Sequence, residues 1–299
     1  MEAKTHPVFE SINRAEELMP LVPKASAFFA ICGPDIGFDS MDLRDGFLSI
    51  RRVTNPPGVV RVARAANLER SDYLGVSRYS LGVRAEMAVG NEGSEEDEEF
   101  LMNMAWHTAA LLKLRGHVTL LCPASSTASW DTLGAIPDNS VNFRMLDDVP
   151  RQIRLSTADI PLSPEDVRWV DSNFDAAMEL RNAENSRRFG LAFNMMYVWN
   201  HTYDLRIAIA NIWVGPEALF GNRNDRPATE ALAQRISDWL PTVSKDRVKA
   251  LYNQRCNCVH GRWLNEREVY RDLEESELLL REALVKCIET KTKTLPDWH

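Results

Sequence analysis

The feature that most constrains the fold is a change in residue pattern after residue 162. Upstream, short apolar runs alternate with Gly and Pro, which is typical of mixed strands and helices. Downstream, apolar residues recur at helical spacing. The change coincides with Ser163-Pro164-Glu165-Asp166, where a serine N-cap, a proline at the first helical position and two acids mark a helix start. The sequence therefore predicts an α+β domain over residues 1–155 and an all-α helical bundle over residues 160–292.

The C-terminal part is predicted to be an antiparallel helical bundle. Its last segment places Val269, Leu273, Leu280 and Leu284 along one stripe, and acids precede this segment while lysines follow it, as the helix dipole favours. Earlier segments show the same kind of spacing. We expect helices over residues 164–182, from 186 to 200, 205–219, 229–240, from 244 onward, and 266–289.

The N-terminal part mixes short strand-like runs with one longer helical segment. The helical segment begins among acidic residues and ends at Arg115-Gly116, a C-cap signal. This half contains no nucleophile elbow, phosphate-binding loop or cluster of metal ligands in its sequence. We expect a helix over residues 98–114, strands over residues 28–32, 47–50, 59–62 and 117–121, and a strand pair across residues 73–90.

The acidic charge of the chain is concentrated in its N-terminal half. The net charge is −8, and residues 1–150 hold 14 Lys and Arg against 21 Asp and Glu, while residues 151–299 hold 21 against 22. This balance does not favour a broad basic surface for nucleic acid. A site for RNA is therefore expected as a local cluster of arginines in the near-neutral C-terminal half, and the acidic half suits a sensor or protein-binding role.

The sequence lacks the features that direct a chain to a membrane or an oxidising compartment. No apolar run approaches the roughly 20 residues that cross a bilayer. The first residues, Met1-Glu2-Ala3-Lys4-Thr5-His6, lack the apolar core of a signal peptide. The five cysteines are odd in number and scattered, unlike a disulfide framework. We therefore expect a cytoplasmic protein with no membrane partner.

The stretch from Tyr252 to Gly261 carries the chemistry. Within it, Arg255 is a permanent cation whose planar fork holds two phosphate oxygens, and His260 exchanges a proton near neutral pH. Cleavage of RNA without a metal needs such a pair, because one group moves a proton at the 2′-hydroxyl or the leaving oxygen and the other stabilises the charge of the transition state. Arg255 and His260 are therefore the candidate catalytic residues.

The spacing of Arg255 and His260 limits how they act together. Five steps along an ideal helix turn about 500°, which places the two residues about 140° apart around the axis. Either the helix is distorted near Gly261, or a second chain completes the site. We favour a two-fold dimer, which brings two copies of the segment together.

In this context the motif resembles a known family. The sequence Arg255-x4-His260, inside Leu251-Tyr252-Asn253-Gln254-Arg255 and Val259-His260-Gly261, is similar to the R-x4-6-H motif of HEPN domains (higher eukaryotes and prokaryotes nucleotide-binding). The run Glu217-Ala218-Leu219-Phe220-Gly221 matches the Glu-x-Leu-Phe element of the Apea-like branch, and Arg247–Tyr252 matches its Arg-led helix. The resemblance covers about residues 163–290, so it leaves the first half without a named motif.

The resemblance implies a helical HEPN bundle that acts as a metal-independent endoribonuclease. Such domains occur in toxin–antitoxin, abortive-infection and other antiphage systems and usually dimerise with the motif at the interface. Arg255 and His260 then take the catalytic roles, and Asn253, Asn257, Glu217 and Tyr252 support them. The implied partners are RNA, a second copy of the chain, and a phage-derived trigger or an antitoxin, with no cofactor and no metal. Many members carry a polar residue directly after the arginine, whereas this chain has Cys256.

Other interpretations of the same residues remain open at this stage. Arg255 and His260 could form a structural pair, with Arg255 bound to Glu217, in a non-catalytic HEPN scaffold that binds nucleotide or protein. Cys256-x-Cys258-x-His260 could hold a metal, although buried thiols are the simpler interpretation. A third hypothesis is an unrelated enzyme whose site lies in the N-terminal half. Several arginines could hold RNA or form a solvated face, namely Arg187, Arg188, Arg262, Arg267 and Arg271.

Overall fold

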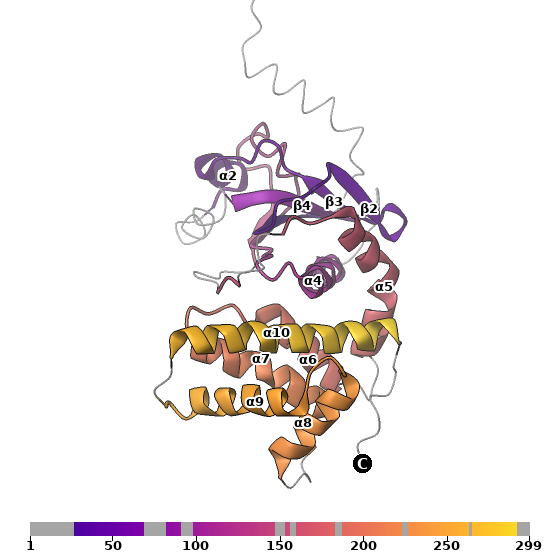
Figure 1. Cartoon of the computed structure of the whole chain (residues 1–299). Coiled ribbons are helices and arrows are strands. Elements are labelled where there is room, and N and C mark those ends of the chain that lie inside the picture. The colour runs from indigo at the N-terminus through magenta and orange to yellow at the C-terminus, as the bar shows by residue number, and fades with distance from the viewer. Residues whose placement is uncertain are drawn as a thin grey trace, which may run out of the picture. The chain divides into compact units, whose positions relative to one another are not determined.

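The structure is a computed structural model, which describes residues 27–68, 82–90, 98–146, 153–155, 160–182, 187–222, 227–262 and 265–291. The chain divides into two compact units that interleave along the sequence. One comprises Met1–Ala109, Thr119–Pro150 and Asp159–Asp171, and the other Ala110–Val118, Arg151–Ala158 and Ser172–His299. An antiparallel sheet with helices occupies the N-terminal part and is followed by helices (Figure 1), so the predicted order of an α+β part and a helical part is confirmed.

The first unit is built on an antiparallel sheet that has six strands within the described residues, in the order β2-β3-β4-β1-β5-β6. The central strands β1 and β4 are buried along nearly their whole length, because both faces of the sheet are covered there. The strands are β1 (Ala27–Cys32), β2 (Ser40–Leu43), β3 (Leu48–Arg52), β4 (Val83–Val89), β5 (Ala124–Ser126) and β6 (Phe143–Met145).

Helices and a short 3-10 turn complete this unit. The turn η2 (Arg44–Gly46) connects β2 and β3. Helix α4 (Glu98–Leu114) has the bounds predicted from its acidic start and its glycine stop, and its residues from Ala110 onward belong to the second unit. Strand β4 lies inside the region predicted to hold a strand pair, and the residues of that region from 73 to 81 lie outside the described residues.

The prediction of a strand over residues 59–62 was wrong. These residues begin helix α2 (Val59–Ala66), which follows Pro56-Pro57-Gly58. The run of valines is strand-like in composition, but Val62 and Ala65 lie three positions apart on one helix face and pack in the same apolar cluster as Phe28 of the sheet. Burial against the sheet therefore outweighs the β propensity of valine.

The prediction of a strand over residues 117–121 was also wrong. Gly116 turns the chain with a φ of +102°, and Leu121 pairs with Cys32 only as an isolated bridge. The intervening backbone is used elsewhere, since the Val118 carbonyl accepts a hydrogen bond of 2.7 Å from Asn200 Nδ2. The side-chain amide of Asn200 therefore donates the hydrogen bond that a neighbouring strand would donate in a sheet.

The second unit is a helical bundle, and its helices agree with the sequence prediction to within about two residues. Side-chain N-caps fix several starts: Asp204, Ser244 and Asn265 accept hydrogen bonds from the backbone N–H groups of the first turn. The helices are α5 (Pro164–Asn182), which is shared with the first unit, α6 (Arg187–Val198), α7 (Leu205–Phe220), α8 (Ala228–Trp239), α9 (Lys245–Val259) and α10 (Glu266–Glu289).

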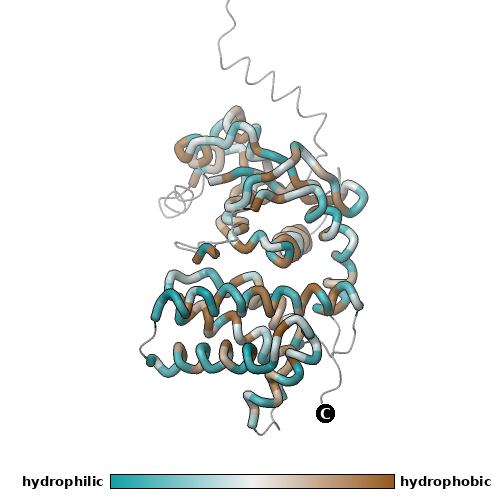
Figure 2. The backbone as a smooth tube through the Cα atoms, viewed as in Figure 1, coloured by the Kyte–Doolittle hydropathy of each residue, from teal (hydrophilic) through white to brown (hydrophobic). Residues whose placement is uncertain are grey.

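Helix α7 is the core of the bundle and packs against α6, α8, α9 and α10. Ile209, Ile212, Trp213, Leu219 and Phe220 are fully buried. In contrast, hydrophilic residues recur along the whole of α9 (Figure 2), which is the helix that carries the motif. Within the described residues, no helix combines the length and apolar character that crossing a bilayer requires.

Helices α7 and α10 approach closely where a glycine faces a leucine. A Cβ atom built on Gly215 would lie 2.6 Å from a methyl carbon of Leu280, which is closer than real carbon contacts. One turn away, the Trp213 indole N–H donates to Ser276 Oγ over 3.0 Å, so the buried indole is satisfied across the same interface.

The core of this unit also contains a buried carboxylate. Glu277 of α10 is 1% exposed, and its Oε2 lies 3.4 Å from Arg281 Nη2. Burial raises the pKa of Glu277 to about 7, although Arg281 acts in the opposite direction and Glu274 and Glu282 add to the rise. The folded bundle therefore favours the neutral acid more strongly than the unfolded chain does.

Replacing Gly215→Ala is expected to destabilise the chain by about 1–3 kcal/mol, because the added methyl overpacks the contact with Leu280. Gly190→Ala on α6 is the matched control, since its Cβ would meet ordinary contacts at 3.7 Å, and it should stabilise by up to about 1 kcal/mol. Urea unfolding midpoints measure both. Equal stabilisation by the two alanines would contradict the close approach.

Glu277→Gln is expected to flatten the dependence of stability on pH. In the wild type the folded pKa exceeds the ordinary value of 4.5, so the stabilising contribution is complete below about pH 4.5 and is lost as pH rises to about 7. Glutamine does not titrate, so unfolding free energies measured across this window should fall more steeply for the wild type. An identical slope in both proteins would show that Glu277 titrates normally.

Candidate functional site

The candidate site begins with the way helix α9 ends. Gly261 has a φ of +66°, and its N–H donates to the Cys258 carbonyl over 3.2 Å, while Arg262 N–H donates to the Asn257 carbonyl over 3.1 Å. These two bonds form a Schellman motif, which a glycine at this position favours. The helix is therefore regular up to Val259, and His260 is its C-cap. A local distortion does not bring His260 to the face of Arg255.

Arg255 is held on the side of α9 that faces α7. Its Nη2 lies 3.1 Å from Glu217 Oε2, and its guanidinium carbon lies 5.6 Å from the centre of the Tyr252 ring. The side chain reaches back toward the start of the helix, as long helical side chains do. The side chains of Arg255 and Glu217 are 23% and 30% exposed, so the pair is partly desolvated. The pairing suggested by the sequence is present.

Tyr252 supports this ion pair from one turn earlier. Its ring packs edge-on against Trp213 of α7 at 5.4 Å. Burial raises the pKa of Tyr252 to about 12, and the negative charge of Glu217 and a hydrogen bond to it act in the same direction. The phenol is therefore a neutral donor at physiological pH, and it orients the Glu217 carboxylate instead of serving as a base.

The other predicted residues lie apart from this cluster. His260 is exposed at the end of α9, and Val259 beside it is 53% exposed. Asn257 Oδ1 accepts a hydrogen bond of 3.1 Å from Arg262, and Asn253 is exposed. A single chain thus brings together Arg255, Glu217 and Tyr252, and it leaves His260, Asn253 and Asn257 on other parts of the helix.

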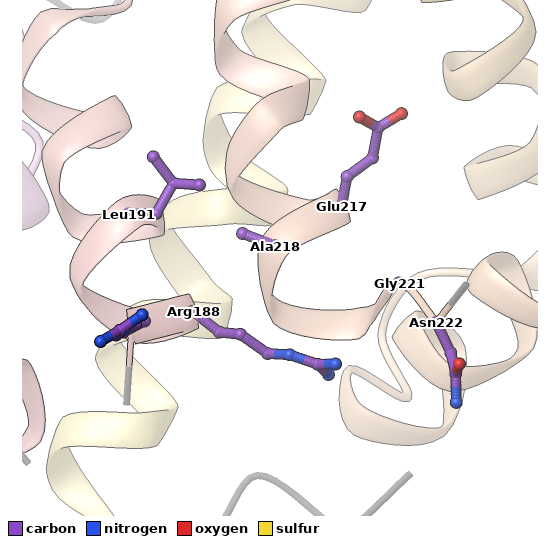
Figure 3. Close-up of a pocket in the computed structure, with 7 residues that line it drawn as sticks. Arg188, Leu191, Glu217, Ala218, Gly221 and Asn222 are labelled. Atoms are coloured by element: carbon purple, nitrogen blue, oxygen red, sulfur yellow. The ribbon is translucent and has the colours of Figure 1, made fainter. Parts of the chain in front are cut away.

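A pocket lies next to the cluster, at the end of α7. It has a volume of about 490 Å³ and is lined by Glu217 and by the exposed residues Arg187 and Arg188 of α6 (Figure 3). The sequence marked both arginines as candidates, but their position beside Glu217 depends on how α6 packs against α7. The remaining lining residues are Leu191, Ala218, Gly221 and Asn222, of which Ala218 and Gly221 belong to the run that resembles the Glu-x-Leu-Phe element.

Three observations argue against a metal site at the cysteines. Burial raises the pKa of the Cys258 thiol to about 11, which disfavours the thiolate that binds a metal. Cys258 and His260 are two positions apart, so they point to different sides of the helix end. Among the residues that the structure describes, no three His, Cys, Asp or Glu side chains gather closely enough to hold a metal ion.

Comparison with known proteins gives no match to this chain among family models, curated proteins or solved structures. The helical bundle and the residues around Arg255 therefore carry the functional inference.

A double-mutant cycle is expected to show coupling between Glu217 and Arg255. The unfolding free energies of Glu217→Ala, Arg255→Ala and the double variant should give an interaction energy of about 1 kcal/mol, because the pair is partly buried. The pair Glu165–Arg168 is the control, since its side chains are 69% and 59% exposed and no measurable coupling is expected. Additive single effects at 217 and 255 would contradict the ion pair.

Proposed function

We propose that this chain is an endoribonuclease of the Apea-like HEPN type that cuts RNA without a metal and acts as a homodimer. The observation that carries the proposal is the placement of the Arg255-x4-His260 motif on α9 of a helical bundle, where Glu217 and Tyr252 orient the arginine and the histidine is exposed. The fold supports the bundle that the motif implies, and the motif supplies the chemistry.

The roles follow from the chemistry of the two side chains. His260 is exposed and moves the proton at the 2′-hydroxyl or at the leaving oxygen. Arg255 binds the scissile phosphate and stabilises the charge that develops on it. Its side chain is 23% exposed, so part of it remains accessible to a phosphate while Glu217 holds Nη2.

Helix geometry supports the dimer. In one chain the Arg255 guanidinium reaches back toward Tyr252, away from the end where His260 lies. A two-fold axis beside α9 would place His260 of one chain near Arg255 of the other. The 53% exposed side chain of Val259 gives this end of the helix an apolar contact for a second copy.

The biological setting that we propose is an effector of antiphage defence or a toxin, located in the cytoplasm. The acidic N-terminal part would then sense a phage-derived trigger or bind an antitoxin, and so restrain the nuclease. The net charge of −7 over residues 1–150, which is 14 cations against 21 anions, suits protein recognition better than contact with RNA.

The alternative is a non-catalytic HEPN scaffold that binds nucleotide or protein. One observation favours it: Glu217 already neutralises Arg255, and within the described residues His260 makes no hydrogen bond or ion pair that would orient its ring. In that case the cluster of Arg255, Glu217 and Tyr252 would serve only to fasten α9 to α7.

The two functions are separated by RNA cleavage in the presence of a chelator. We expect the wild type to cut single-stranded RNA to products with 2′,3′-cyclic phosphate ends, and Arg255→Ala or His260→Ala to slow cleavage about 10²- to 10⁴-fold. Gln234→Ala, at an exposed position of α8, keeps the motif intact and serves as a control for preparation. Tight nucleotide or RNA binding without cleavage in any preparation would establish the scaffold instead.

Mixing the two inactive variants tests the shared site. If Arg255 of one chain acts with His260 of the other, a heterodimer of Arg255→Ala and His260→Ala contains one intact site. Random mixing should then restore about one quarter of the wild-type activity. No recovery after subunit exchange, with the wild type active and dimeric, would place both residues of a working site in one chain.

A further inference from the structure

The pocket at the end of α7 combines a concave shape with two exposed cations. Arg187 and Arg188 enter it from the first turn of α6, and Figure 3 shows the Arg188 side chain extended beneath the last turn of α7 toward Gly221. The positive end of the α6 dipole adds to their charge. The pocket adjoins the Arg255 cluster, because Glu217 lines the pocket and also binds Arg255, which is not a lining residue.

The charge of these two arginines is uncompensated within the described part of the chain. Neither has an ion pair or a hydrogen bond there, whereas Arg247 binds Asp272 and Lys249 binds Glu230, each over 2.6 Å. Glu217 is a lining residue, but its carboxylate points away from Arg188 (Figure 3) and binds Arg255 instead. The pocket therefore suits an anionic ligand, whose charge would balance that of the two arginines.

The walls of the pocket are held in place. Arg235 of α8 donates from Nη1 to the Phe220 carbonyl over 2.9 Å, which fixes the last turn of α7. A Cβ at Gly221 would lie 2.5 Å from the Glu217 carbonyl oxygen, so the chain closes over that turn with no room for a side chain. The pocket is thus part of the folded bundle and does not require an induced change.

The lining chemistry fits a sugar–phosphate chain. Two guanidinium groups bind phosphate oxygens in pairs, and the Asn222 amide offers further hydrogen bonds. Leu191, which is 42% exposed, and Ala218 provide an apolar side for a ribose. The described lining residues include no aromatic ring on which a base would stack, so recognition would be independent of base identity.

We propose that Arg187 and Arg188 bind a backbone phosphate of an RNA strand that flanks the scissile phosphate. This proposal rests on the proposed nuclease function. Glu217 connects the two places, because it lines the pocket while its carboxylate binds Arg255. Arg255 does not line the pocket, so the phosphate bound by Arg187 and Arg188 would be a neighbour of the scissile phosphate and not the scissile phosphate itself.

The binding test uses a His260→Ala chain, which leaves RNA uncut. Fluorescence anisotropy with a labelled single-stranded RNA is expected to show about tenfold weaker binding at low salt after Arg187→Ala and Arg188→Ala are introduced together. The slope of log affinity against log salt should fall by about 0.7, because one phosphate is no longer neutralised. The control removes Lys245 and Lys249 in the same way, which deletes the same charge from cations already paired with Glu230.

The outcomes separate this proposal from the nuclease function. Unchanged RNA affinity in the double arginine variant, or an equal loss in the lysine control, overturns the phosphate subsite even if the wild type cuts RNA. If the double arginine variant binds RNA more weakly but no preparation cuts RNA, the phosphate subsite is supported and the nuclease function is overturned. The RNA assignment is also overturned if the double arginine variant binds RNA normally but no longer binds a labelled free nucleotide.

Kinetics give an independent readout in an active chain. The double arginine variant should raise KM for an oligonucleotide and leave cleavage of a dinucleotide unchanged, because a dinucleotide has no flanking phosphate. A lower kcat on both substrates would mean that the two arginines act through the fold, and it would overturn the subsite.

Discussion

The ion pair between Arg255 and Glu217 joins the motif helix α9 to the core helix α7, and the candidate site depends on it. The pair fixes the direction of the arginine, brings Tyr252 into the same network and turns the guanidinium away from the exposed end of α9. It lies over a core in which Trp213 and Ser276 are bonded and Gly215 lets α7 approach α10. The exposed site is therefore supported by a rigid interior, as functional groups require.

The helices of the bundle could be predicted because their start and stop signals are local. Ser163, Ser244 and Gly261 act through bonds within one turn, and the apolar stripes record which face is buried. The prediction of a strand at residues 59–62 was wrong because the conformation of this segment is decided by its contact with the sheet. Local sequence propensity does not contain that contact. The same holds for residues 117–121, where the backbone bonds to a distant asparagine.

The site divides in the same way. Arg255, Glu217 and Tyr252 could be selected from the sequence because they lie in short motifs, and the structure brings them together. The pocket formed by Arg187 and Arg188 with the end of α7 could not, because no spacing within either helix reveals how two helices pack. For His260 the helical period was informative: residues five positions apart on a regular helix face different directions.

The glycine-terminated end of α9 has a consequence for how such a protein would be switched. Three consecutive backbone N–H groups, those of His260, Gly261 and Arg262, are bonded to carbonyls of the last turn, so the main chain that carries the imidazole is anchored to the helix. The ring rotates, but its attachment point does not travel as a loop residue would. Under the proposed dimeric function, catalysis would then be governed by encounter of the chains. At dilutions where monomers prevail, the rate would rise with the square of protein concentration. A partner that keeps the two chains apart would abolish activity without altering the catalytic side chains.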